Sequence, residues 1–130
     1  MRQAIKDKIN ADIKKAKVNL AHLQITDEEI EDIIKEIYRL EPNVSVIKLD
    51  NNQLSDKGAL VLKDCLHEFS QLTKLDLQFN HIDRDGAIAV FGLIKELDHL
   101  EILFHGNKIT DAGDMENIKT TALNQQRLTP

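Results

Sequence analysis

Aliphatic residues recur in short alternating runs through the middle of the chain, and each run ends in a polar turn. The runs at 44–54 and 72–82 share one order of apolar and polar positions, and a third run ends at residue 109. The same position in each turn holds an asparagine, and these asparagines lie 28 and 27 residues apart: Asn52, Asn80 and Asn107. Alternation with a period of two is typical of a strand with one buried face. The pattern predicts three successive strands, each followed by a turn.

A second set of positions repeats in the same register. A glycine lies six residues after each asparagine: Gly58, Gly86 and Gly113. A residue suited to cap a helix follows each turn: Ser55, Asp83 and Thr110. Each unit therefore reads as strand, turn and capped helix. The third unit is one residue shorter, and its helical region from Asp114 to Ala122 has Asn117 and Thr121 where aliphatic residues would be expected.

Residues 44–113 resemble leucine-rich repeats of the ribonuclease-inhibitor type, because all three runs fit the LxxLxLxxNxL template with aliphatic substitutions. The resemblance implies an α/β solenoid, a short horseshoe with a parallel concave sheet, outer helices and an N-terminal helical cap. One such unit cannot bury its apolar face alone, so the units stack on a shared core. We expect Ile47, Leu75 and Ile102 to lie side by side on adjacent strands. The asparagine side chains are expected to bond backbone groups in the turns.

The first 42 residues are expected to form the N-terminal helical cap. One helix is predicted over residues 3–22, with an apolar stripe and six basic against two acidic residues in 1–22. A second is predicted over 24–40 as a degenerate half-repeat, with Thr26 and Glu29 as a capping box. The basic helix is also compatible with a membrane surface or a partner. Three repeats are expected over 43–118, and a C-terminal cap or tail over 119–130.

The leucine-rich-repeat resemblance implies that the concave sheet binds a partner, and the register says which side chains line it. The predicted partner-binding residues are Lys48, Asp50, Lys74, Asp76, Gln78, Phe79, Glu101, Leu103 and His105. Strands about 4.8 Å apart would let Lys48 pair with Asp76, and Lys74 with Glu101. Phe79 and Leu103 are apolar at exposed positions, which is typical of interface anchors. Alternatively, one or both tuck under a neighbouring loop.

Composition narrows the function classes. The chain has 130 residues, a net charge of −5 and one cysteine, Cys65. The acidic balance argues against general nucleic-acid binding. The single cysteine excludes an intramolecular disulfide, and we expect a reducing, cytoplasmic location. No apolar run reaches about 18 residues, so no membrane span is expected. Cys65 with His67, and Asp98 with His99 and His105, do not form a convincing catalytic or metal-binding set.

These observations favour a protein-binding module over an enzyme, without a cofactor or metal and monomeric by itself. Its resemblance to ribonuclease inhibitors implies an inhibitor or regulator that covers a functional site of its partner, which could itself be an enzyme. The lead-in ITDEEI at 25–30 and the short degenerate repeats are also similar to leucine-rich-repeat effectors of Legionella-like intracellular bacteria. That resemblance implies secretion into a host cell and a host protein or another effector as target. A non-inhibitory adaptor and an enzyme with an unrecognised site are the alternatives.

Overall fold

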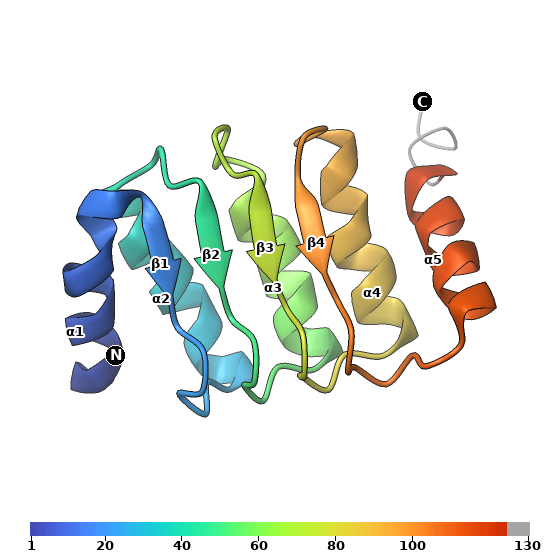
Figure 1. Ribbon diagram of the computed structural model, residues 1–130, viewed down its shortest axis with the longest axis horizontal. Coiled ribbons are helices and arrows are strands. Elements are labelled where there is room, and N and C mark those ends of the chain that lie inside the picture. Colours follow the sequence, from blue (N-terminus) through green and yellow to red (C-terminus); the bar gives the residue numbers. More distant parts are fainter. Residues whose placement is uncertain (125–130) are drawn as a thin grey trace.

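The computed structural model describes residues 1–124 as a four-stranded parallel sheet backed by helices (Figure 1). The strands follow chain order across the sheet: β1 (Lys17–Asn19), β2 (Val46–Lys48), β3 (Lys74–Asp76) and β4 (Glu101–Leu103). Three helices cover one face of it: α2 (Asp27–Leu40), α3 (Asp56–Leu66) and α4 (Arg84–Phe91). Two helices lie at the ends of the stack: α1 (Gln3–Asp12) and α5 (Ala112–Asn124). Short 3-10 segments follow α1 and α4: Ile13–Lys15 and Gly92–Lys95.

The predicted register of the three repeat strands is confirmed. Ile47 on β2 is the partner of Leu75 on β3, which is in turn the partner of Ile102 on β4. Ile47 and Leu75 are fully buried, whereas Ile102 at the end of the sheet is only partly buried. Strand residues that alternate with the exposed ones thus fill a single core between sheet and helices, as the period of two requires.

The asparagine of each unit joins that unit to the one before it. The Asn52 amide donates to the backbone oxygens of Leu20 and Leu49, and its oxygen accepts from the Ile25 N–H at 2.9 Å. The side chains of Asn80 and Asn107 make the corresponding bonds one and two units further along. All three asparagines are buried. The predicted bonding of the turns by asparagine is confirmed, since these backbone groups lie beyond the reach of the strand ladder.

Adjacent helices are held together at their N-termini by an acidic residue. The Asp27 carboxylate, at the start of α2, accepts from the backbone N–H groups of Ser55 and Gly58 at 2.8 and 3.0 Å. The Asp56 carboxylate, at the start of α3, accepts from the Asp83 N–H at 2.7 Å. The next helix starts with Arg84, so the series of carboxylates stops there.

The repeated glycines are explained by this close approach of helix ends. A Cβ atom on Gly86 would lie 2.8 Å from the Asp56 Cα, and a Cβ on Gly58 would collide with the Asp27 carboxylate. Gly113 has no neighbour closer than 3.6 Å to such an atom. Helix α5 is therefore not held against α4 in the way that α3 and α4 are held to their predecessors.

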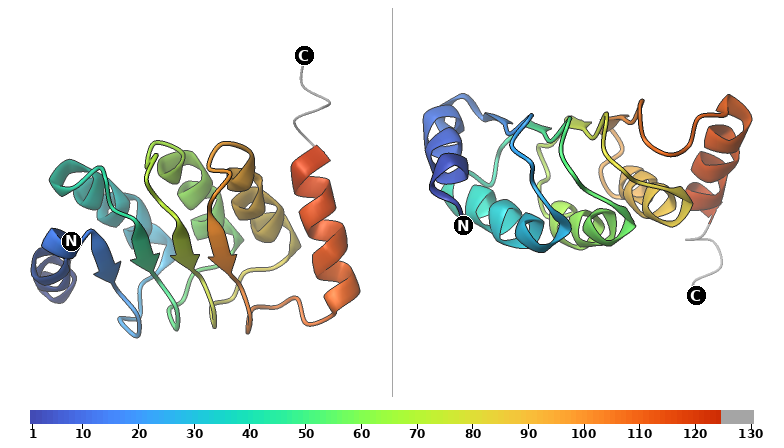
Figure 2. Two further views of the ribbon diagram at one scale, coloured as in Figure 1. Left: turned by 45° about the horizontal axis from the view of Figure 1, so that its top comes forward. Right: turned by 90° about the horizontal axis from the view of Figure 1, so that it is seen from below.

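The stack curves because its two layers have different spacings. Neighbouring strands lie about 4.8 Å apart, whereas packed helices lie about 8–10 Å apart. The helices therefore form the longer outer arc and the sheet the shorter inner one (Figure 2). The sheet surface turned away from α2, α3 and α4 is the concave face predicted from the repeats, and we call it the sheet face.

The expected single helix over residues 3–22 is wrong in its last part. Helix α1 ends at Asp12, Ala16 takes a left-handed backbone conformation with φ of 57°, and β1 pairs in parallel with β2. Hydrogen bonds to β2 override the helical spacing of the apolar residues. The second predicted helix is confirmed as α2, and so is its capping box of Thr26 and Glu29. The grouping of residues 1–42 as a cap stays a prediction.

The last helix differs from its expected form at its start. Thr110 does not cap it. Asp111 does, because its carboxylate accepts from the Gly113 N–H and its carbonyl from the Met115 N–H. The described part of the predicted C-terminal cap, residues 119–124, belongs to α5. The remainder of that cap or tail lies outside the described residues.

Candidate protein-binding face

Three strands, β2, β3 and β4, place the predicted binding residues in rows across the sheet face. The parallel register aligns Lys74 with Glu101 in one row, and Lys48 with Asp76 and Leu103 in the next. Asp50, Gln78 and His105 continue this alignment beyond the strand ends, where the Asn51 and Phe79 N–H groups bond the Gln78 and His105 carbonyls. Eight of the nine residues retain exposure, and only Asp76 is buried, at 5% exposed.

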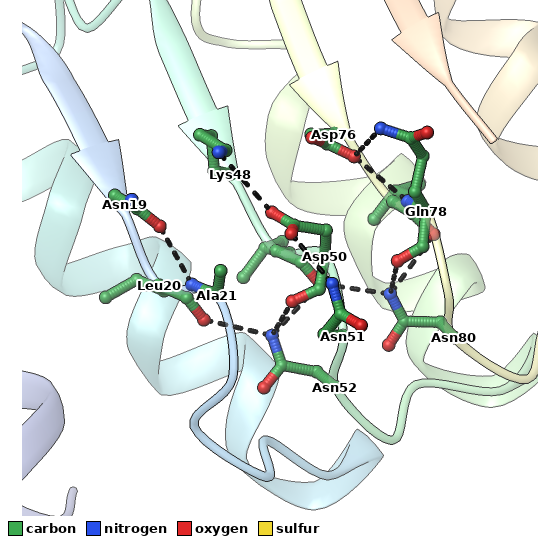
Figure 3. A network of polar contacts seen from close by, with 12 residues as sticks. Asn19, Leu20, Ala21, Lys48, Asp50, Asn51, Asn52, Asp76, Gln78 and Asn80 are labelled. Carbon is green, nitrogen blue, oxygen red and sulfur yellow. Dashed lines mark hydrogen bonds and ion pairs between the residues drawn. The ribbon is translucent and has the colours of Figure 1, made fainter. Parts of the chain in front are cut away.

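The charged side chains of the sheet face pair partly as expected. The predicted contact between Lys74 and Glu101 is confirmed at 3.7 Å. The predicted pair of Lys48 with Asp76 is wrong, because the Lys48 ammonium lies 3.9 Å from the Asp50 carboxylate on its own chain segment instead (Figure 3). Asp76 is occupied by Gln78, whose backbone and side-chain N–H groups both donate to it. The hydrogen bonds from Gln78 to Asp76 within one turn thus replace the expected ion pair between Lys48 and Asp76.

Asp50 has an oxygen with unused hydrogen-bonding capacity. Its Oδ2 accepts from the Asn51 side-chain amide at 2.9 Å. Its Oδ1 is buried and has no hydrogen-bond partner among the residues that the structure describes. This oxygen is the one that the Lys48 ammonium approaches at 3.9 Å, so Asp50 is compensated by an ion pair and not by a hydrogen bond.

Phe79 combines exposure with an unfavourable backbone. Its side chain is 49% exposed, and its φ of 57° lies in the left-handed region. Asn51 and Gly106 occupy the same place in the neighbouring units with φ of 57° and 84°. Asparagine and glycine adopt this conformation readily, whereas a bulky aromatic residue does so rarely. The repeated Asn and Gly before the repeat asparagine are a sequence signal that could have revealed this geometry.

The ring of Phe79 lies against the next turn. Its centroid is 5.7 Å from that of His105 in an edge-on arrangement. A Cβ on Gly106 would collide with the ring, so only glycine leaves space for it. Phe79 does not tuck under a loop, as the alternative expectation held, but stays exposed with one face supported. Leu103 is half-buried and lies opposite Asp76 in the register.

The structure adds β1 to the sheet face, which the sequence pattern missed. Lys17 and Asn19 are both exposed there, aligned with Val46 and Lys48 of β2. The usual asparagine signal is absent from this unit, where Leu23 stands in its place. The reason is structural: each repeat asparagine bonds the preceding unit, and no strand precedes β1.

The candidate chemical groups elsewhere do not assemble. Burial, followed by the nearby Glu31 charge, raises the pKa of the Cys65 thiol and so disfavours its thiolate. Within residues 1–124, no group of three histidine, cysteine or acidic side chains is arranged to hold a metal. In the same part of the chain, no helix is both long and apolar enough to cross a bilayer.

Comparisons with known proteins agree with this geometry. The Leucine Rich repeat family matches residues 71–91. NLR family CARD domain-containing protein 4 from Bos taurus is 33% identical over 86 residues, which are 66% of this chain. This chain spans 8% of that relative's length.

Two solved structures share the fold over nearly the whole chain. The leiomodin-1 actin-binding site 2 domain superposes with a TM-score of 0.65 at 21% identity, covering 95% of this chain and 90% of that one. The tropomodulin C-terminal domain of Caenorhabditis elegans gives 0.62 at 12% identity, covering 95% and 96%. At these identities the likeness concerns the fold. Together with the stacked strands and asparagines, the comparisons support the identification of the chain as a leucine-rich-repeat protein.

Proposed function

We propose that the chain binds a partner protein through its sheet face and regulates that partner by covering a functional site. The observation that carries this proposal is Phe79, a half-exposed aromatic side chain held in a left-handed backbone conformation. Residues kept in such conformations cluster at ligand-binding positions. Asparagine or glycine would serve the turn better, so the aromatic ring has to be useful for something other than folding.

The surroundings of Phe79 fit an interface anchor. His105 supports the ring edge-on, and Leu103 on β4 adds a half-buried apolar side chain to the sheet face. Gln78 and Asp50 provide polar groups nearby, and both retain partial exposure. An aromatic centre with a polar rim is the usual anatomy of a binding hot spot.

A structural neighbour of the same fold supports protein binding rather than catalysis. The leiomodin-1 domain of similar fold is an actin-binding site, so a domain of this shape binds a protein there. A curved sheet of exposed side chains can cover a convex surface, which is how occlusion would inhibit a partner. An adaptor without inhibitory effect uses the same surface, and so would a bacterial effector bound to a host protein. We also propose a reducing location and a monomeric state, as expected from the sequence.

The test compares three exposed apolar residues changed to the same charge. Partner capture is measured for Phe79→Glu, Leu103→Glu and the control Leu60→Glu. Leu60 is 48% exposed, almost as much as Phe79, but lies on α3 on the opposite layer. We expect the first two variants to lose a partner that the wild-type chain and the Leu60 variant retain. Equal capture by all four proteins would refute the sheet-face assignment.

An activity assay of the captured partner then separates inhibition from recruitment. The purified partner is assayed alone, with the wild-type chain and with Phe79→Glu. Inhibition by the wild type and its loss in the variant would support occlusion. Full partner activity in a saturated complex would favour the adaptor alternative.

Phe79→Asn offers a finer version of the same test. Asparagine relieves the left-handed strain, while the edge-on contact with His105, worth about 0.5–1.5 kcal/mol, is lost. We expect the free energy of unfolding to stay within about 1 kcal/mol of the wild type, measured by urea denaturation. Binding should nevertheless weaken, and a variant that binds as tightly as the wild type would remove Phe79 from the interface.

A further inference from the structure

Every junction between adjacent units uses the same backbone groups. A carbonyl at the end of one strand accepts from the asparagine amide of the next unit: Leu20, Leu49 and Leu77. An N–H at the start of the helix connection donates to the oxygen of that same asparagine: Ile25, Leu54 and Ile82. Because this arrangement occurs three times, it shows what the open side of a unit binds: the asparagine side chain of the next unit.

The outer edge of β4 presents the same groups, and no strand of residues 1–124 pairs with it. By register, Phe104 supplies the carbonyl and Ile109 the N–H. Phe104 accepts from Asn107 of its own unit, and the Ile109 N–H has no hydrogen bond to any residue in 1–124. Glu101 and Leu103 direct their backbone groups to β3. Those of Ile102 therefore point to the open side, because successive strand residues alternate.

A hollow of mixed polarity lies along the same edge. Its volume is about 420 Å³. Its apolar lining comes from Phe91, Ile102, Phe104, Ile109 and Met115, and its polar lining includes His105, Asp111, Glu116 and Lys119. Helix α5 forms the far wall, set apart from the last strand (Figure 2). The Lys119 ammonium lies 5.5 Å from the Phe91 ring centroid at one side. Alternate side chains of a strand paired with β4 would point into this hollow, as those of β4 point into the core beside β3.

We propose that the β4 edge binds an extended segment of a partner polypeptide that carries the leucine-rich strand and turn: aliphatic residues at alternate positions, followed by asparagine. The segment runs parallel to β4, pairs with Ile102, and places its asparagine between the Phe104 carbonyl and the Ile109 N–H. Its aliphatic side chains fill the hollow. This mode of strand addition uses backbone bonds for affinity and side-chain pockets for specificity.

The partner is a different polypeptide rather than the first strand of a second copy. In this chain the outer side of β1 is occupied by α1, and the Asp12 carboxylate accepts from the Asn19 N–H at 3.0 Å. A head-to-tail stack of identical chains would have to displace α1, whose Ile5 and Ile9 are fully buried. The hollow adjoins the sheet face at His105, which lines both. The proposal uses the backbone groups of Ile102, Phe104 and Ile109, so it does not rest on the proposed function above.

The probe is a labelled synthetic peptide with the sequence of residues 72–82, which holds the complete strand and turn of one unit. Its binding to the full chain is measured by fluorescence anisotropy, beside a peptide in which Asn80→Ala removes the asparagine. We expect saturable binding that weakens at least tenfold without the asparagine. Amide hydrogen exchange should slow at Ile102 and Ile109 and remain unchanged at Asp50 on the sheet face.

Two variants of the chain test the edge itself. Ile102→Pro removes an N–H that the internal ladder does not use, so the sheet is expected to remain, as proline is tolerated on edge strands. Ile102→Ala is the matched control, because it shortens the same side chain but keeps the N–H. We expect the proline variant to bind the peptide at least fivefold more weakly than the alanine variant, with similar circular dichroism for both.

Three results would overturn the proposal. Equal peptide affinity with and without the asparagine, and with and without the Ile102 N–H, would show that the edge is not the site. Amide protection on β3 or its turn instead of β4 would show the same. Concentration-dependent dimers of the chain alone, abolished by Ile102→Pro, would assign the edge to a second copy. If the proline variant unfolds, the exchange pattern of the wild-type complex decides the matter.

Discussion

The two ends of the repeat stack are both covered by a helix, yet they differ in how completely the core is closed. At the first end, Ile5 and Ile9 of α1 are fully buried, and the helix packs against β1. At the other end, α5 buries Ile118 and Ala122 but leaves a hollow of about 420 Å³ beside β4. Helix α1 therefore packs tightly beside β1, whereas α5 packs loosely beside β4.

The first end of the stack also has more polar contacts between its end helix and the neighbouring unit than the last end has. Arg2 donates to the Glu29 carboxylate of α2 at 2.6 Å and to the Leu23 carbonyl at 2.7 Å, which ties α1 to the first unit. At the last unit, Arg84 replaces the carboxylate that would hold the next helix start, and Asp111 bonds only within its own turn. The end helix with specific bonds to its neighbouring unit is thus also the one that lies closer to the core.

The largest expected effect is at the closed end. Ile9→Ala would leave a cavity under α1 and should lower the free energy of unfolding by about 2–5 kcal/mol. Met115→Ala, at the wall of the hollow, should cost less than about 1 kcal/mol because that side chain is only partly buried. Urea denaturation measures both. Similar losses would mean that the two caps are equally well packed.

The repeated glycines provide a second matched comparison. Gly86→Ala would push its Cβ against the Asp56 backbone, so we expect a loss of about 1–3 kcal/mol from overpacking. Thermal or urea unfolding of the purified variant provides the measurement. A neutral result would show that α3 and α4 can separate without cost.

Gly113→Ala should act in the opposite direction. Nothing crowds a Cβ there, and alanine favours helix over glycine by about 1 kcal/mol, so the variant should be more stable by roughly that amount or less. Slower amide exchange along α5 would accompany the gain. Destabilisation instead would indicate that α5 packs against α4 more tightly than the structure shows.

The smallest effect concerns the polar tie of α1. The Arg2 guanidinium, by its hydrogen bond, holds the pKa of the Glu29 carboxyl below its ordinary value of 4.5. A lowered folded-state pKa means that the stabilisation is present above that ordinary value and is lost as the pH falls through the lowered one. Arg2→Gln should therefore destabilise the chain slightly at neutral pH and not at all in acid.

A carbon-13 NMR titration of Glu29 checks this directly. The pKa of its carboxyl should rise in Arg2→Gln and stay unchanged in Arg39→Gln, which removes the separate pair with Glu36. An unchanged Glu29 titration in Arg2→Gln would mean that the pair does not form in solution.

The sequence predicted which residues lie on the sheet face, but it predicted their ion pairs only in part. The nine predicted residues do lie on or beside the strands, and Lys74 does meet Glu101. The Lys48 partner was wrong because Asp50, two residues along the chain, and Gln78, two residues after Asp76, compete locally for the same groups. Such side-chain choices depend on local distances that a repeat pattern does not contain.

The repeating pattern by itself determined the stacked strands, their register, the buried asparagines and the aliphatic core. It could do so because each of these follows from bonds between equivalent positions in neighbouring units. Only the tertiary structure decided that residues 17–19 form a strand, that Phe79 stays exposed in a left-handed turn, and that α5 leaves the β4 edge open. These features belong to the ends and to single departures from the repeat, where contacts with non-equivalent neighbours outweigh local preference.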